Sequence, residues 1–134
     1  MITLAQPATR VYWYLICSGY RTWRFLPVFF REYWPNMFAP TPRYQQQILD
    51  TLGAKKFGDQ YVPGAGVVRL SSAAPLRHGV SDVTARRLSD PQVAFFARVN
   101  PGHVNGDELA CLTEIAPSNL TKAGQRMVSS PVEQ

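Results

Sequence analysis

The sequence predicts a mainly α protein, in which several short helices are joined by long Pro/Gly-containing loops and the chain is extended and partner-dependent rather than folded around one compact core. Eleven prolines lie between Pro7 and Pro131 with at most 20 residues between neighbours, which disfavours a long uninterrupted helix or a central strand. Helix start and stop signals recur at short intervals. Aromatic residues are concentrated, with 11 of 16 in the first 38 positions. The rest of the chain is therefore poorly supplied with large core side chains.

The first predicted element is an amphipathic helix over residues 10–31. At about 100° per residue, four arginines share one arc, and aromatic and aliphatic residues collect on the opposite side. The basic face is Arg10, Arg21, Arg24 and Arg31. We expect the apolar side and its neighbours to dock on a partner or a membrane through Tyr12, Trp13, Leu15, Ile16, Trp23, Leu26, Phe29, Phe30 and Trp34. Residues 1–38 are thus interpreted as a docking segment, and residues 39–134 as an accessory region of short helices.

Two helices of the accessory region are marked by their ends. Thr41-Pro42 reads as an N-cap followed by proline, and Gly53 as a left-handed stop, which predicts a helix over 42–52 with Tyr44, Ile48 and Leu52 on one face. Ser89-Asp90-Pro91 and Asn100-Pro101-Gly102 delimit a helix over 91–99, with Val93, Phe96 and Val99 on one face.

The other segments of the accessory region have weaker secondary-structure signals. Leu109, Leu112 and Ile115 have helical spacing and predict a helix over 107–115, and Ser118 can cap another helix through about Met127. The run 67–70 is the only predicted strand. Residues 62–76 are rich in small residues, glycine and proline, and are expected to form a loop.

The net charge of +5 reflects scarce acids rather than dense bases. Residues 1–38 carry +3 and the last 35 residues carry −2. A chain built to neutralise phosphate is expected to have dense Lys and Arg clusters, so nucleic acid is an unlikely partner.

The N-terminal segment is long enough to cross a bilayer but poorly suited to it. Arg21 and Arg24 lie near the middle of residues 11–30, and each costs roughly 2.5–3.5 kcal/mol at a helix centre. A position in the membrane interface is the better interpretation, because arginines can meet lipid phosphates there. No secretory signal is recognisable, while the basic, acid-free composition is similar to that of a mitochondrial targeting segment.

The sequence offers little catalytic chemistry. Cys17 and Cys111 lie 94 positions apart outside any metal-binding pattern, and we expect buried free thiols. Gly64-Ala65-Gly66 is expected to be a turn rather than a phosphate loop. His103 and Asp107 have i, i+4 spacing, but the glycines around them favour a loop. No metal site and no cofactor are predicted.

These observations predict a non-catalytic structural subunit of a large assembly. Its partners would be other protein subunits and a membrane surface or lipid headgroups, at the mitochondrial inner membrane, peripheral or partly embedded, in a respiratory-chain or ATP synthase type of complex. An RNA-associated subunit of a ribosome-like particle is the alternative. A small enzyme using His103 and Asp107 is a third possibility.

Overall fold

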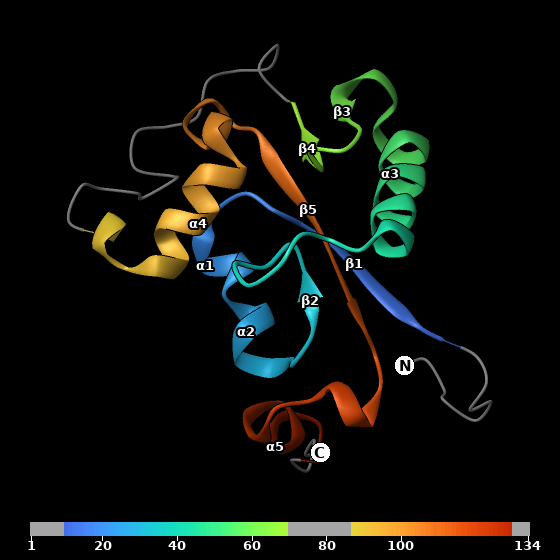
Figure 1. Cartoon of the computed structure of the whole chain (residues 1–134), viewed down its shortest axis with the longest axis vertical. Helices are drawn as coiled ribbons and strands as arrows, with labels where there is room; N and C mark the ends of the chain where they lie inside the picture. The colour runs from blue at the N-terminus through green and yellow to red at the C-terminus, as the bar shows by residue number, and fades with distance from the viewer. Residues whose placement is uncertain (1–9, 70–86, 130–134) are drawn as a thin grey trace, which may run out of the picture.

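Strand β5 (Glu108–Glu114) is the strand on which the sheet is assembled. In the computed structural model, which describes residues 10–69 and 87–129, β1 (Tyr12–Cys17) pairs antiparallel along one edge of β5. β4 (Val67–Val68) and β2 (Tyr33–Trp34) pair with different parts of its other edge. β3 (Tyr61–Val62) extends the sheet by pairing with β4. The result is a five-stranded antiparallel sheet in which residues near the two ends of the described chain are neighbours (Figure 1).

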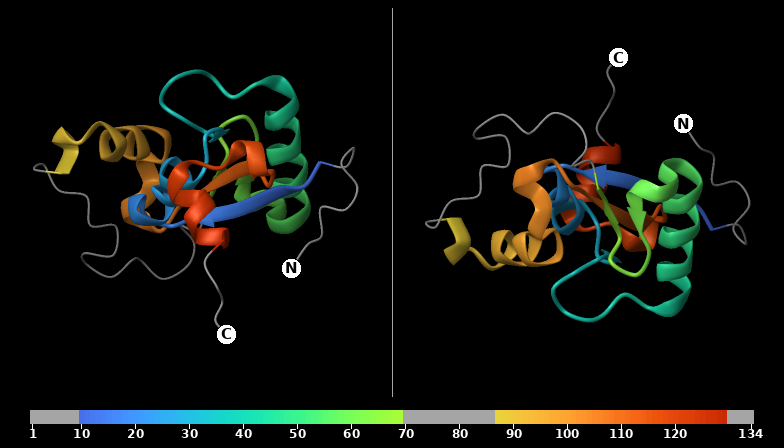
Figure 2. Two further views of the ribbon diagram at one scale, coloured as in Figure 1. Left: turned by 90° about the horizontal axis from the view of Figure 1, so that it is seen from below. Right: turned by 90° about the horizontal axis from the view of Figure 1, so that it is seen from above.

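Helices cover both faces of this sheet. α1 (Tyr20–Trp23), α2 (Phe25–Phe29) and α4 (Pro91–Val99) lie on one side, and α3 (Arg43–Phe57) lies on the other (Figure 2). α5 (Lys122–Ser129) packs against α2. Short 3-10 turns complete the described structure at Gly58–Gln60, Arg87–Ser89, Pro101–Asn105 and Pro117–Asn119.

Alternate residues of β5 belong to two hydrophobic cores. Leu109 and Cys111 contact the core beneath α1, α2 and α4, whereas Ala110 and Leu112 contact the core beneath α3. This alternation follows from the two-residue period of a strand. Because both faces are covered, the apolar residues of β5 are continuous in sequence, as expected of a central strand.

The larger core is aromatic. Trp23 is fully buried, and its ring lies 5.4 Å from the ring of Phe95 and 6.0 Å from that of Tyr33, centroid to centroid. Leu26 and Phe96 are also fully buried in this cluster. Burying each such side chain stabilises the fold by roughly 1.5–3 kcal/mol relative to exposure. The N-terminal aromatics therefore pack with side chains contributed by α4 and β5.

The predicted fold class is wrong. The described chain forms a compact mixed α/β fold with many long-range contacts, not an extended set of helices. The supposed shortage of core residues after position 38 was misleading, because Phe95, Phe96 and the aliphatic residues of β5 complete a core around Trp23. An extended, partner-dependent architecture is excluded for the described ranges.

The predicted helix over residues 10–31 is also wrong. Residues 12–17 form β1, and helical structure begins only at Tyr20, in two short helices. Aromatic and β-branched residues favour a pleated strand, and pairing with β5 outweighs the helical periodicity. The arginines of this segment consequently do not share one helix face.

The helix predicted over 42–52 exists but is longer. α3 runs to Phe57, and Gly58, with φ of 56°, ends it. Gly53 lies within the helix and is buried against the ring of Tyr61, where a Cβ atom would overlap the ring. Pro42 is at the N-cap, where no side-chain cap hydrogen bond is made, so Thr41 does not have the expected capping role.

The predictions for the remaining elements are confirmed in some cases and wrong in others. The helix over 91–99 is confirmed, with the Asp90 side chain accepting a hydrogen bond from Gln92 N. The helix predicted over 107–115 is wrong, because this segment is β5. A helix after Ser118 is present but begins at Lys122. The predicted strand is confirmed at residues 67–68, whereas residue 70 and the later part of the 62–76 loop lie outside the described residues.

Candidate functional site

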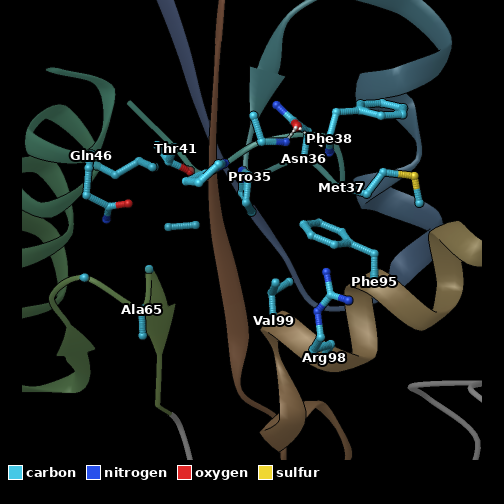
Figure 3. Close-up of a pocket in the computed structure, with 16 residues that line it drawn as sticks. Pro35, Asn36, Met37, Phe38, Thr41, Gln46, Ala65, Phe95, Arg98 and Val99 are labelled. Atoms are coloured by element: carbon cyan, nitrogen blue, oxygen red, sulfur yellow. Dashed lines mark hydrogen bonds between the residues drawn. The ribbon is translucent and has the colours of Figure 1, made fainter. Parts of the chain in front are cut away.

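A groove of about 600 Å³ opens between α4 and the loop that joins β2 to α3 (Figure 3). It is lined by 16 residues, drawn from residues 35–41, from α3, from the turn between β3 and β4, from α4 and from β5. Its size is within the range of cavities that hold small ligands. Among the residues that the structure describes, none of those lining the groove is acidic, and Arg98 is the only charged one.

The α4 wall presents a cation on an aromatic ring. The guanidinium carbon of Arg98 lies 5.2 Å from the centroid of Phe95, and Val99 follows it on the same wall. Figure 3 shows the Arg98 side chain extending between Val99 and Phe95 into the groove. Within residues 10–69 and 87–129, Arg98 forms no ion pair with a carboxylate. Stacking on Phe95 holds the guanidinium in place while leaving its N–H groups for a ligand.

The opposite wall is shaped by the side chain of Asn36. Its Nδ2 donates to the Tyr33 carbonyl at 2.8 Å, and its Oδ1 accepts from the backbone N–H groups of Phe38 at 2.9 Å and Ala39 at 3.1 Å. Trp23 Nε1 donates to the Pro35 carbonyl at 3.2 Å, which ties this loop to the aromatic core. The wall is therefore fixed by hydrogen bonds rather than left to loop packing.

Asp50 fixes the turn at the base of the groove without entering it. One carboxylate oxygen accepts hydrogen bonds from Tyr61 Oη at 2.6 Å, Gln46 Nε2 at 3.0 Å and Gly64 N at 3.1 Å. Burial acts to raise the pKa of Asp50, but these hydrogen bonds outweigh it and hold the pKa below its ordinary value. Gly64 and Gly66 both have positive φ, which suits the predicted turn.

The predicted docking residues do not form a common surface. Trp23, Leu26, Phe30 and Trp34 are buried in the protein's own cores. Only Trp13 among the nine is exposed, at 42%. The other four, Tyr12, Leu15, Ile16 and Phe29, are partly buried.

The four predicted basic residues lie apart as well. Arg10 lies 3.8 Å from Glu114 beside β1, and Arg21 contacts the ring of Tyr20. Arg24 separates α1 from α2, while the Arg31 side chain donates to the Leu120 carbonyl at 3.0 Å. Arg24 and Arg31 thus flank the two ends of α2, whereas Arg10 pairs with Glu114 of β5.

A different apolar surface occurs where α2 meets α5, and we call it the α2–α5 surface. Its exposed apolar residues are Phe25 (52%), Val28 (47%), Met127 (48%) and Val128 (62%). Its exposed cations are Arg24, Arg31, Lys122 and Arg126. Arg24 and Arg31 were predicted as part of a basic face, but the contribution of α5 was not predicted, because nothing local in either segment indicates that the two helices meet.

Hydrogen bonds join the two helices of this surface. Thr121 Oγ1 donates to the Val28 carbonyl at 2.6 Å, and Thr121 N donates to the Phe29 carbonyl at 3.1 Å. Gly124 lies so close to the Phe29 carbonyl oxygen that a Cβ atom would overlap it. The two helices therefore form one packed unit.

His103 and Asp107 are not part of the groove. His103 is only 7% exposed, and burial lowers its pKa. It lies beside Phe96 with ring centroids 6.0 Å apart. This environment is that of a packed core histidine, so it adds no support to the enzyme hypothesis.

The two cysteines are buried free thiols, as predicted. Their sulfur atoms are 3.6 Å apart across β1 and β5. Burial raises the pKa of Cys111, and contact with Cys17 raises it further.

The comparisons with known proteins find no matching family model, no matching curated protein and no matching solved structure. Within the described ranges, none of the helices combines the length and apolar character needed to cross a bilayer.

Proposed function

We propose that the protein is a non-catalytic accessory protein that binds peripherally to an anionic membrane surface through the α2–α5 surface. The observation that carries this proposal is a combination of two features. Four exposed apolar side chains lie on two helices that contact each other, and four exposed cations lie on or beside these helices: Lys122 and Arg126 on α5, Arg24 and Arg31 at the two ends of α2. Aromatic and aliphatic residues flanked by Arg and Lys are the composition expected of an interfacial membrane contact.

The apolar part has the chemistry required for shallow insertion. Phe25 stacks on Phe29 with ring centroids 5.8 Å apart and an interplanar angle of 17°, while Phe25 itself stays half exposed. On α5, Gly124 and Val128 are four residues apart, and Gly124 is buried against α2 whereas Val128 is exposed. Because Val128 lies beyond the contact with α2, its side chain is available to insert into the apolar part of a membrane.

The charges support an anionic surface rather than a neutral one. Neither α2 nor α5 contains an acidic residue, and the exposed Glu32, which follows Arg31, leaves the cations of this surface in excess. Each Lys or Arg held near an anionic leaflet contributes about 1 kcal/mol of binding free energy. A mitochondrial location, and membership of a respiratory-chain or ATP synthase type of assembly, stay predictions from sequence composition.

Vesicle sedimentation with the full chain tests the apolar part of the proposal. We expect binding to vesicles of phosphatidylcholine with phosphatidylserine and little binding to phosphatidylcholine alone. Replacing Phe25→Ser together with Val128→Ser is expected to weaken binding about 10- to 30-fold, because each residue loses about 1 kcal/mol of apolar burial. Tyr44→Ser with Val104→Ser is the matched control, since both residues are exposed elsewhere, at 57% and 58%.

A second pair of variants tests the charges. Arg24→Gln with Lys122→Gln is expected to weaken binding to the anionic vesicles about 30-fold, from two charges at about 1 kcal/mol each. Arg43→Gln with Lys55→Gln removes the same net charge from α3 and is expected to have a much smaller effect. Equal losses in both pairs would show that net charge alone attracts the protein, and the proposal would fail. Binding to single-stranded RNA without vesicle binding would also refute it and support the RNA-associated alternative.

A further inference from the structure

We propose that the groove between α4 and the β2–α3 loop binds a small organic monocarboxylate with an apolar body. In this arrangement the carboxylate pairs with Arg98 and the apolar body lies along Phe95, Val99 and Met37. The proposal concerns a site separate from the α2–α5 surface and does not depend on the proposed function.

The positive charge of Arg98 favours an anionic ligand in the groove. Arg98 is the only ionic residue of the lining, and within the described ranges no carboxylate neutralises it. Asp50, although close to the base of the groove, accepts three hydrogen bonds from the protein and does not line the cavity. An anion entering the groove therefore meets an attractive charge without an opposing lining carboxylate.

The geometry favours a carboxylate over a phosphate. One guanidinium can form two parallel hydrogen bonds to a carboxylate and compensate its single charge. A phosphate monoester carries closer to two charges at neutral pH, and among the described residues the lining supplies no second cation to balance the other charge. The guanidinium carbon of Arg98 lies over the Phe95 ring, which helps to hold the guanidinium in place.

The rest of the groove suits an apolar body with a polar end. Met37, Phe95 and Val99 lie on the same side as Arg98, while Thr41 and Gln46 lie across the opening (Figure 3). Gln46 uses its Nε2 to donate to Asp50, which leaves its carbonyl oxygen as an acceptor. The volume of about 600 Å³ accommodates such a ligand with room for water.

The experiment is a titration of the ¹⁵N-labelled full chain with 3-phenylpropionate, followed by NMR. Its neutral amide, 3-phenylpropionamide, is the matched ligand control. A ligand of this size is expected to bind with a Kd of about 0.1–10 mM. We expect the acid to shift the resonances of residues 36–39, 64–66 and 95–99, and to bind at least about 10-fold more tightly than the amide.

Two protein variants complete the test. Arg98→Gln is expected to weaken binding of the acid about 10- to 100-fold and to leave the amide unaffected, while Arg43→Gln, which removes a charge outside the groove, should change neither. Ala65→Phe keeps Arg98 but fills the groove, and is expected to abolish binding of both compounds. Equal binding of acid and amide, retention of acid binding by Arg98→Gln, or shifts confined to residues outside the groove would overturn the proposal.

Discussion

Replacing Asn119 by alanine is expected to be among the most destabilising substitutions of a buried polar residue in this fold. Asn119 is 8% exposed, and its side chain joins three segments. Oδ1 accepts from Glu32 N at 2.7 Å, and Nδ2 donates to the Glu32 carbonyl at 3.1 Å, to Thr113 Oγ1 at 3.1 Å and to the Glu114 carbonyl at 2.9 Å. The alanine variant loses all four contacts and leaves their partners partly buried.

The expected cost follows from those four contacts. A hydrogen bond contributes about 1 kcal/mol net, and a buried partner left without one costs more. Thr113 Oγ1 and the Glu32 carbonyl keep their mutual bond of 2.7 Å, so part of the network survives. We therefore expect a loss of about 3–4 kcal/mol, a large share of the 5–15 kcal/mol typical of a domain. At about 3–5 °C per kcal/mol, the melting temperature should fall by about 10–15 °C.

Urea and thermal unfolding, followed by tryptophan fluorescence and circular dichroism, measure this loss. Asn105→Ala is the matched control, because Asn105 is exposed, and it should change the free energy of unfolding by less than about 0.5 kcal/mol. Asn119→Asp keeps the acceptor but not the donors, so its stability should lie between that of Asn119→Ala and wild type. A loss below about 1 kcal/mol for Asn119→Ala would refute the role assigned to the network.

Three further predictions concern other parts of the fold. The folded-state pKa of Asp50 is lowered, so its contribution is complete above the unfolded pKa near 4 and is lost as pH falls through the folded pKa. Asp50→Asn should therefore cost about 1 kcal/mol at pH 7 and progressively less as the pH falls through the folded pKa, measured by urea unfolding. The Cys111 thiol is fully buried with a raised pKa, so a disulfide-exchange reagent should label the cysteines only after denaturation, and rapid labelling of the native protein would contradict this. Gly124→Ala should destabilise by about 1–3 kcal/mol in thermal unfolding, because its Cβ meets the Phe29 carbonyl, whereas Gly19→Ala, in open space, should be close to neutral.

Local sequence was sufficient to predict helices whose first or last residues have a recognised capping role. Asp90 followed by Pro91 predicts the start of α4 because a carboxylate accepts from an early helical N–H and proline suits the first turn, and the structure has both features. The start of α3 was predicted at Pro42 with Thr41 as the N-cap, one residue before its observed start at Arg43 with Pro42 at the N-cap. Its end was misplaced because Gly53, which resembles a stop signal, is required instead for close packing against Tyr61.

The strands β1 and β5 could not be predicted from local sequence, although β4 was. Leu109, Leu112 and Ile115 are spaced as on a helix, but β5 is buried on both faces, and a short apolar run of this kind is ambiguous between helix and strand. β1 is a strand because it pairs with β5, and Tyr12 lies opposite Glu114, 102 positions later in the chain. No window of sequence around either strand contains the other.

The groove was missed for the same reason. Arg98, Gln46, Asn36 and Ala65 belong to four segments, and each is unremarkable in its own context. The sequence could show that the N-terminus is rich in aromatics, but not that Trp23 packs against Phe95 across the fold. Candidate sites assembled from distant segments are predictable only once the pairing of the strands is known.

The position of β5 has a consequence for biosynthesis. Because β1, β2 and β4 all pair directly with residues 108–114, the sheet cannot close during translation until those residues have left the ribosome. Until then Trp23 and the other N-terminal aromatics lack the strand that completes their core. Before residues 108–114 emerge, the nascent chain therefore exposes apolar side chains that the folded protein buries, and such surface promotes aggregation.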